Sequence, residues 1–204
     1  KLDTTNRVIS LGAFVSQFRL FAGDADSTLV IGSPISGSAG LRLVRMPGSS
    51  SSATFEFPIA NAGLSGTLTA DEGTRVRIGN KEAIANCALD CRSGSVVEVD
   101  AGRVGSRGAQ VAELPTSSDW TIDVTGAPGK EVVPLGICQK TLQEVGGSAP
   151  VTACLNGRSA VATLAQDGAD VVLGVSSRVA QVAELRVNGY QGTETLTNFP
   201  VLVR

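Results

Sequence analysis

The sequence predicts an all-β fold. Apolar and polar residues alternate with a period of two in short segments, for example STLVIG (27–32), TRVRIG (74–79) and SVVEVD (95–100). Such alternation is typical of strands with one buried and one solvated face, as in antiparallel sheets. Turn-forming segments such as MPGSSSS, TGAPGK and VNGYQG separate these strands, at a spacing of roughly 10–13 residues. The best helix candidate, GICQKTLQEV (136–145), lacks a clear N-cap.

Internal similarity indicates a repeat with a long period. SLGAFVSQF (10–18) matches SRGAQVAEL (106–114), and GDADSTLVIG (23–32) resembles SSDWTIDVTG (117–126), both at a separation of about 95 residues. The segment SRGAQVAEL (106–114) also returns almost unchanged as SRVAQVAEL (177–185). A frame of about 95 residues is close to the size of one antiparallel β-sandwich, either immunoglobulin-like or jelly-roll-like.

We therefore predict two tandem β-sandwich domains, residues 1–103 and 104–204, that arose by internal duplication. The boundary lies in the Gly-rich segment AGRVGSRG (101–108). The alternative is a continuous β-solenoid, in which rungs of roughly 20–25 residues replace the two sandwiches.

The composition argues against several classes of function. The chain has no His, which excludes Ser-His-Asp and Cys-His catalysis, and Lys81 lies in a predicted turn rather than beside a nucleophile. The net charge is −2 and no basic stripe occurs, so we expect no nucleic-acid partner. No apolar run reaches the roughly 18–20 residues of a membrane-spanning helix. We therefore predict no enzymatic activity, no membrane span and no required cofactor.

Four cysteines are present, and an even number in a Gly- and Ser-rich chain favours disulfides and an oxidising compartment. The local pairs Cys87–Cys91 and Cys138–Cys154 would give each predicted domain one bridge. Free buried thiols are the first alternative. A metal site is the second, although no His is available to complete a zinc set.

Acidic pairs at strand starts are weak candidates for a calcium site, because calcium prefers oxygen ligands. Asp is also an ordinary turn former, so turn chemistry remains the competing interpretation. The candidates are Asp24, Asp26, Asp71, Glu72, Asp167 and Asp170. Trp120 alternates with Ile122 and Val124, which predicts a core position rather than an exposed recognition anchor.

Apolar strands lie near both ends of the sequence, in RVISLGAFVSQFRLF (7–21) and NFPVLVR (198–204). Unpaired strands at sheet edges can add a strand from a neighbouring subunit. The alternative is that both segments pair within their own sheets. The candidate residues for an assembly edge are Val8, Ile9, Leu11, Phe199, Val201 and Val203.

GTETLTNFPVLVR (192–204) resembles the opening strands of a β-sandwich domain of unknown function found in large secreted bacterial surface proteins. The resemblance covers a short part of the chain and includes no catalytic motif. It implies a bacterial surface context.

Together these observations predict a non-enzymatic structural or adhesive subunit of an extracellular or cell-surface assembly, such as a surface layer, filament, sheath or particle shell. It would associate with itself or with other shell proteins through strand edges. The alternative is an extracellular ligand-binding module that recognises glycans or depends on calcium.

Overall fold

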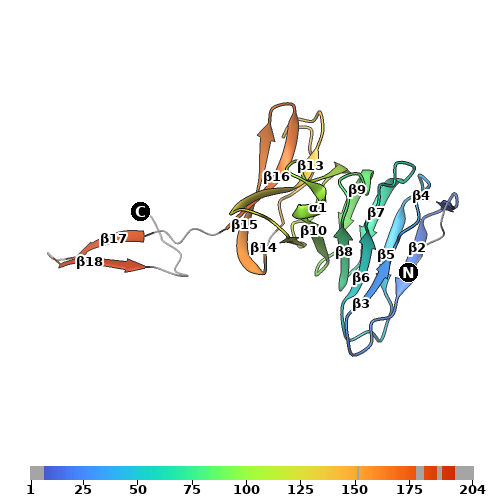
Figure 1. Cartoon of the computed structure of the whole chain (residues 1–204), viewed down its shortest axis with the longest axis horizontal. Coiled ribbons are helices and arrows are strands. Elements are labelled where there is room, and N and C mark those ends of the chain that lie inside the picture. Colours follow the sequence, from blue (N-terminus) through green and yellow to red (C-terminus); the bar gives the residue numbers. More distant parts are fainter. Residues whose placement is uncertain (1–6, 151, 178–181, 188–189, 196–204) are drawn as a thin grey trace.

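The computed structural model describes residues 7–150, 152–177, 182–187 and 190–195. The protein is all-β, with 52% of its residues in strands, which confirms the predicted fold class. The strands coil into a β-solenoid of about five turns (Figure 1). The solenoid alternative of the sequence analysis is therefore the observed architecture. We call one turn of this solenoid a rung.

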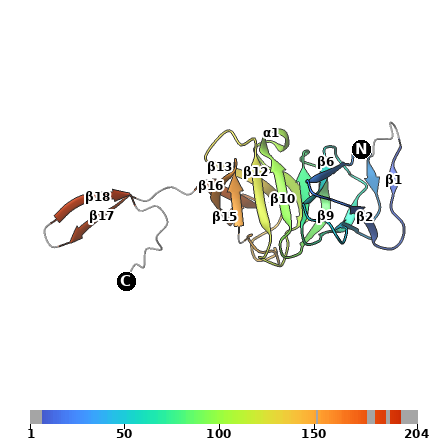
Figure 2. The same ribbon diagram turned by 90° about the horizontal axis from the view of Figure 1, so that it is seen from below.

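Each rung contributes one strand to each of two parallel sheets. Sheet one contains β2 (Ser16–Leu20), β5 (Leu41–Arg45), β7 (Ser65–Ala70), β9 (Ile84–Cys91), β11 (Ala109–Glu113) and β13 (Glu131–Ile137). Sheet two contains β3 (Ser27–Val30), β6 (Ala53–Phe57), β8 (Thr74–Ile78), β10 (Val96–Asp100), β12 (Thr121–Thr125) and β14 (Thr152–Leu155). In Figure 2 the rungs of the solenoid follow one another along the long axis of the molecule.

The core lies between the two sheets and is built from rows of side chains in register. In sheet two, Phe55, Val76 and Val97 are neighbours on successive strands, and all three are fully buried. In sheet one, Leu43 is followed by Ala70 in the same way. Trp120 is also buried, at 1% exposure, so its predicted core position is confirmed.

The C-terminal end of the solenoid is closed by an antiparallel hairpin. Its strands are β15 (Arg158–Asp167) and β16 (Asp170–Ser177). β16 pairs with β13 and β15 pairs with β14, so the hairpin occupies the last edge of both sheets. Because both edges are bonded, β13 and β14 offer no free edge to a neighbour. We call it the capped end.

Three smaller elements complete the fold. The strands β1 (Ile9–Ser10) and β4 (Ile35–Ser36) pair in parallel on a short third side. One helical turn, α1 (Ala101–Val104), follows β10, and its N-cap Asp100 accepts a hydrogen bond from the amide of Gly102. The strands β17 (Val182–Val187) and β18 (Tyr190–Thr195) form a separate two-stranded sheet.

The prediction of two antiparallel sandwiches is not what the structure shows, because the strands from β2 to β14 pair in parallel. Alternation of apolar and polar residues indicates one solvated face and one buried face of a strand, but not whether the strand pairs in parallel or antiparallel. In this solenoid each parallel sheet is backed by the other sheet, which leaves its outer face in solvent, whereas in most parallel sheets helices cover both faces. The sequence pattern of a solenoid strand therefore resembles that of a sandwich strand.

The long-period similarity has a structural explanation. The segment 10–18 reaches the first half of β2 and the segment 106–114 contains β11, and these strands lie in the same sheet four rungs apart. The segments 23–32 and 117–126 contain β3 and β12, which are related in the same way. The ladders β9–β11 and β10–β12 cross the predicted boundary at 103/104. The duplication stays a prediction.

Candidate functional site

The N-terminal end of the solenoid, formed by β1, β2 and β3, has free strand edges. Within the described part of the chain, β2 and β3 each pair on one side, with β5 and β6. This arrangement contrasts with the capped end, where the hairpin occupies both edges. We call the N-terminal end the open end and treat it as the candidate site.

The backbone of β2 directs half of its polar groups away from the sheet. The amide of Ser16 donates to the carbonyl of Gly40 at 3.2 Å, and the carbonyl of Leu20 accepts from the amide of Met46 at 2.9 Å. Residues alternate between the two sides of a strand. The N–H and C=O groups of Gln17 and Arg19 therefore point towards the open edge. These are the groups that strand addition from a neighbour would use.

The hydrophobic core is incomplete at the open end. Phe18 is the first member of the inward row that continues with Leu43, yet Phe18 is only half-buried while Leu43 is fully buried. In sheet two, Leu29 is half-buried while its neighbour Phe55 is fully buried. Within the part of the chain that the structure describes, the side chains of the first rung thus lack the covering layer that every later rung receives from the rung before it.

Exposed apolar side chains gather on the same rung. Residues 8–21 contain four of the seven large apolar side chains that are exposed in the described part of the chain. They are Val8 (56% exposed), Phe14 (88%), Val15 (59%) and Phe21 (54%). Exposed apolar groups that cluster at one place mark an interaction surface more often than scattered ones do.

The predicted edge residues fall partly on this surface. Val8 is exposed, while Ile9 and Leu11 are half-buried and pack against the core. Phe199, Val201 and Val203 lie outside the described residues. The prediction missed Phe14, Val15, Phe18 and Phe21. The alternation of apolar and polar residues in VSQFRLF (15–21), directly after Phe14, was the sequence signal that could have identified them.

The acidic candidates for calcium do not meet at one place. Asp24 and Asp26 lie between β2 and β3, Asp71 and Glu72 between β7 and β8, and Asp167 and Asp170 at the tip of the capping hairpin. Asp26 accepts a hydrogen bond from the amide of Ser52, and Asp170 from that of Gln139. Among the described residues, no group of three or more acidic, His or Cys side chains could hold a metal ion.

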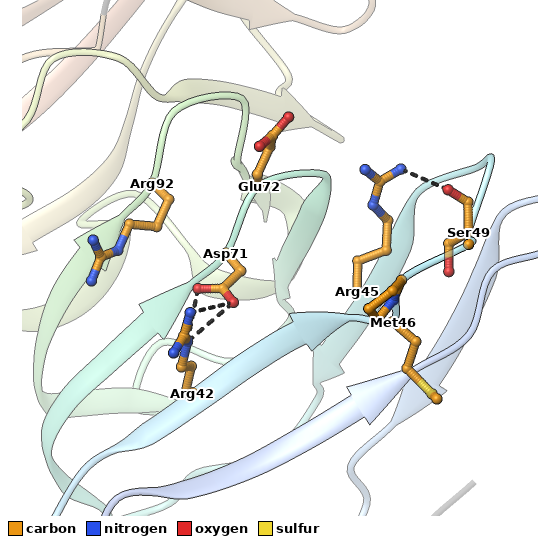
Figure 3. Close-up of a pocket in the computed structure, with 9 residues that line it drawn as sticks. Arg42, Arg45, Met46, Ser49, Asp71, Glu72 and Arg92 are labelled. Atoms are coloured by element: carbon orange, nitrogen blue, oxygen red, sulfur yellow. Dashed lines mark hydrogen bonds and ion pairs between the residues drawn. The ribbon is translucent and has the colours of Figure 1, made fainter.

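An arginine-lined pocket of about 480 Å³ lies at one rim of sheet one (Figure 3). The guanidinium group of Arg42 binds the Asp71 carboxylate at 2.9 Å, and this hydrogen bond and charge raise the pKa of Arg42 above its usual value. Arg45 donates to the carbonyl of Ser49 at 3.3 Å, and Arg92 contributes a third guanidinium group to the lining. The pocket therefore combines three cations with the carboxylates of Asp71 and Glu72.

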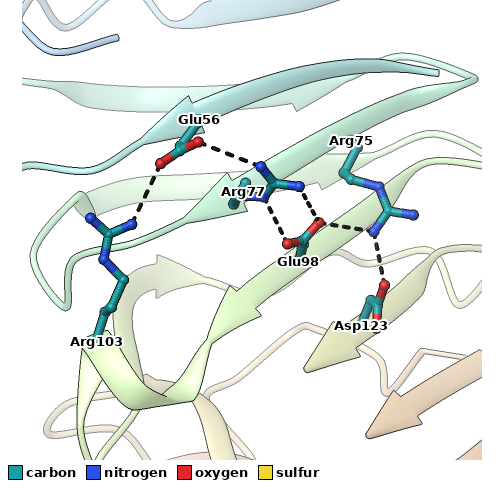
Figure 4. A network of polar contacts seen from close by, with 6 residues as sticks. All are labelled: Glu56, Arg75, Arg77, Glu98, Arg103 and Asp123. Atoms are coloured by element: carbon teal, nitrogen blue, oxygen red, sulfur yellow. Dashed lines mark hydrogen bonds and ion pairs between the residues drawn. The ribbon is translucent and has the colours of Figure 1, made fainter. Parts of the chain in front are cut away.

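The outer face of sheet two carries a ladder of charges (Figure 4). Glu98 accepts from Arg77 at 2.7 Å and from Arg75 at 3.0 Å, and Arg75 also reaches Asp123 at 2.8 Å. Glu56 continues the ladder to Arg77 and to Arg103, both at 3.5 Å. Opposite charges meet between β6 and β8 and between β8 and β10, and Arg75 bridges the like-charged register neighbours Glu98 and Asp123. These contacts across strands support the stacking of rungs. Every charge in the ladder has a partner.

The predicted disulfides are absent. All four cysteines lie in the described part of the chain and are free thiols. Cys87 and Cys91 both lie on β9, four residues apart, which separates them by about 13 Å. A disulfide requires Cα atoms within about 7 Å. Cys138 follows β13 of sheet one and Cys154 lies on β14 of sheet two, and both are free thiols in the structure.

The thiols differ in their expected reactivity. Burial raises the pKa of Cys87 and of Cys91 from 9.0 to about 12, so neither thiol ionises near pH 8 in the folded protein. Because the thiolate is the reactive species, a disulfide reagent at pH 8 should label the exposed Cys138 quickly and these two only after unfolding. Thiol counting with and without urea checks this. A total below four under denaturing conditions would contradict the free-thiol structure.

The fold and the open end define a class: a β-solenoid with one capped end and one open, apolar end. Comparison with family models, with curated proteins and with solved structures found no match. In the described residues, no helix is long and apolar enough to cross a membrane.

Proposed function

We propose that this protein is a non-enzymatic structural subunit of an extracellular or cell-surface assembly, and that it associates through the open end of its solenoid. The observation that carries the proposal is the asymmetry of the two ends. The capped end has both edges bonded, while the open end combines free edge groups at Gln17 and Arg19 with exposed Phe14 and Phe21. A strand from a neighbouring subunit would satisfy these backbone groups and complete the core.

The rest of the molecule supports a structural role. Stacked rungs with a continuous core and a paired charge ladder form a rigid rod-like body, in which each rung contacts its neighbours. The net charge of −2 and the absence of His are consistent with an assembly held by apolar and backbone contacts rather than by catalysis. The extracellular location remains a proposal that rests on composition and on the resemblance at residues 192–204.

The test is the variant Phe14→Ser/Phe21→Ser, measured by light scattering over a concentration series. We expect the wild-type mass to rise with concentration and the variant to keep the mass of one chain, because the variant loses two exposed apolar contacts. The matched control is Leu142→Ser/Val161→Ser, which changes two exposed apolar residues outside the open end. This control should associate like the wild type. Equal association of all three proteins would contradict the proposal.

The alternative function, a ligand-binding module, has its best location in the arginine-lined pocket. Within the described residues, Arg45 has no carboxylate partner, and its guanidinium group donates to the carbonyl of Ser49 alone. An acidic saccharide would suit such a cation better than calcium would. The open end favours assembly as the primary function.

A further inference from the structure

We infer that the occupant of the open end is a second copy of this chain, which pairs its β2 antiparallel to β2 about a two-fold axis at Phe18. This inference rests on the proposed function and specifies its partner. It predicts a closed dimer, joined open end to open end, rather than a filament. The argument depends on the residues of β2 and those directly beside it.

The direction of association follows from the ends. A head-to-tail filament needs a free edge at both ends of each subunit. The hairpin β15–β16 bonds the edges of β13 and β14, so these two strands cannot receive the open end of another copy. Among the described strands of the solenoid itself, the free edges are those of the open end, so a second solenoid that pairs with this edge brings its own open end, which is an isologous contact.

The backbone permits this contact. In antiparallel pairs, residues whose polar groups point at the partner exchange two hydrogen bonds, and the residues between them face each other without bonds. Gln17 and Arg19 direct their backbone groups to the open edge, while Phe18 is paired with Leu43 on the other side. A two-fold axis at Phe18 sets Gln17 of one copy opposite Arg19 of the other, in bonded geometry.

The side chains are self-complementary in this register. Val15 and Phe21 both lie three residues from Phe18, and both are exposed. Antiparallel pairing centred on Phe18 therefore places each Val15 beside the other copy's Phe21. On the inner face the two half-buried Phe18 rings meet and cover the incomplete core. Aromatic and β-branched neighbours of this kind stabilise cross-strand pairs.

The polar residues select the same register. Within one chain, Arg19 already donates to the side-chain oxygen of Gln17 at 2.9 and 3.1 Å, so these two groups are compatible partners. An axis at Arg19 would place two guanidinium groups opposite each other, and like charges directly opposite are unfavourable. An axis at Gln17 would place Arg19 opposite the apolar Val15. Of these three axes, only the axis at Phe18 matches polar with polar and apolar with apolar among the exposed residues Val15, Gln17, Arg19 and Phe21.

The edge of β3 is less suited to the contact. The loop before it carries the exposed carboxylates of Asp24 and Asp26, and no large apolar side chain from residue 22 to residue 30 is exposed. Charged groups near an edge strand oppose pairing with another chain. Strand β2 is flanked by Phe14, Val15 and Phe21 instead, which makes it the pairing edge.

Cysteine cross-linking tests the register directly. Two variants, Val15→Cys and Phe21→Cys, are made in a Cys138→Ser/Cys154→Ser background, and one carries a mass tag. In the predicted pair these positions are opposite each other, with Cα atoms about 5.5 Å apart, which is within disulfide reach. We expect a mixture of the two variants to form a disulfide-linked dimer under mild oxidation. Each variant alone should not form it, because the two copies of one position lie six residues out of register.

A second pair of variants covers the inner face. Phe18→Cys should cross-link to itself across the axis, while Leu20→Cys on the same half-buried row should not. Circular dichroism confirms that both variants fold. Efficient self-linking of Val15→Cys, or a mass above two copies, would overturn the register or the closed dimer and leave association through the open end standing. A mass of one chain at every concentration would overturn the proposed function together with this inference.

Discussion

Replacing Phe55 with Ala is expected to lower the free energy of unfolding by about 3–5 kcal/mol, the usual loss when a large core aromatic is truncated. Phe55 is fully buried on β6 and is in register with Leu29 on one side and Val76 on the other. The ring joins the first three rungs of sheet two, and its removal leaves a cavity that the rigid strands cannot close.

Urea unfolding, followed by circular dichroism, measures this loss. The control is Phe14→Ala, which truncates a ring that is 88% exposed and should change the stability by less than about 0.5 kcal/mol in dilute solution. If Phe55→Ala cost less than about 1 kcal/mol, the second rung would not be packed as described.

Replacing Glu98 with Ala is the second large effect, and we expect a loss of about 2 kcal/mol. Glu98 is 8% exposed and binds both Arg75 and Arg77. The hydrogen bond to Glu98 and the negative charge of Glu98 raise the pKa of Arg77. Its removal leaves two guanidinium groups without their shared carboxylate. The expected loss is below that of a fully buried pair because both arginines are about one-third exposed or less.

The matched control is Glu82→Ala, since Glu82 pairs with Lys81 at an exposed site. Exposed ion pairs contribute less than about 1 kcal/mol. Urea unfolding at low salt should therefore separate the two variants clearly. Equal stability of the two variants would mean that the ladder on sheet two does not help to hold the rungs together.

Much of the strand pattern could be predicted from the sequence. In TRVRIG the structure buries Val76 and Ile78 and turns Arg75 and Arg77 outward, as the alternation indicated. The burial of Trp120 followed from the same rule. Such patterns depend on which face of a strand meets the core, and the alternation of apolar and polar residues within each strand indicates that face.

The pairing of strands could not be predicted in this way. Register and direction depend on which segments meet in space, and the alternation is the same for a sandwich strand and a solenoid strand. The match of 23–32 with 117–126 sets β3 against β12, but a period of about 95 residues fits one sandwich as well as four rungs. A search for shorter periods would have favoured the solenoid.

The candidate site was predicted in part. The N-terminal segment was expected to carry an edge, and Val8 lies on the exposed surface there. The sequence could not tell that one end of the solenoid is capped, because that depends on the hairpin β15–β16 pairing with both β13 and β14. The disulfides failed for a similar reason, because the even count of cysteines says nothing about the extended strand that separates Cys87 from Cys91.

The measurement that tests the central claim most directly is amide hydrogen exchange of the wild-type protein at low and at high concentration, resolved by residue. The amides of Gln17 and Arg19 point to the open edge, whereas that of Phe18 is directed at β5. We predict that Gln17 and Arg19 exchange quickly in dilute protein and become protected as the mass rises, while Phe18 is protected throughout. Rapid exchange of Gln17 and Arg19 in the associated protein would show that the open end is not the interface.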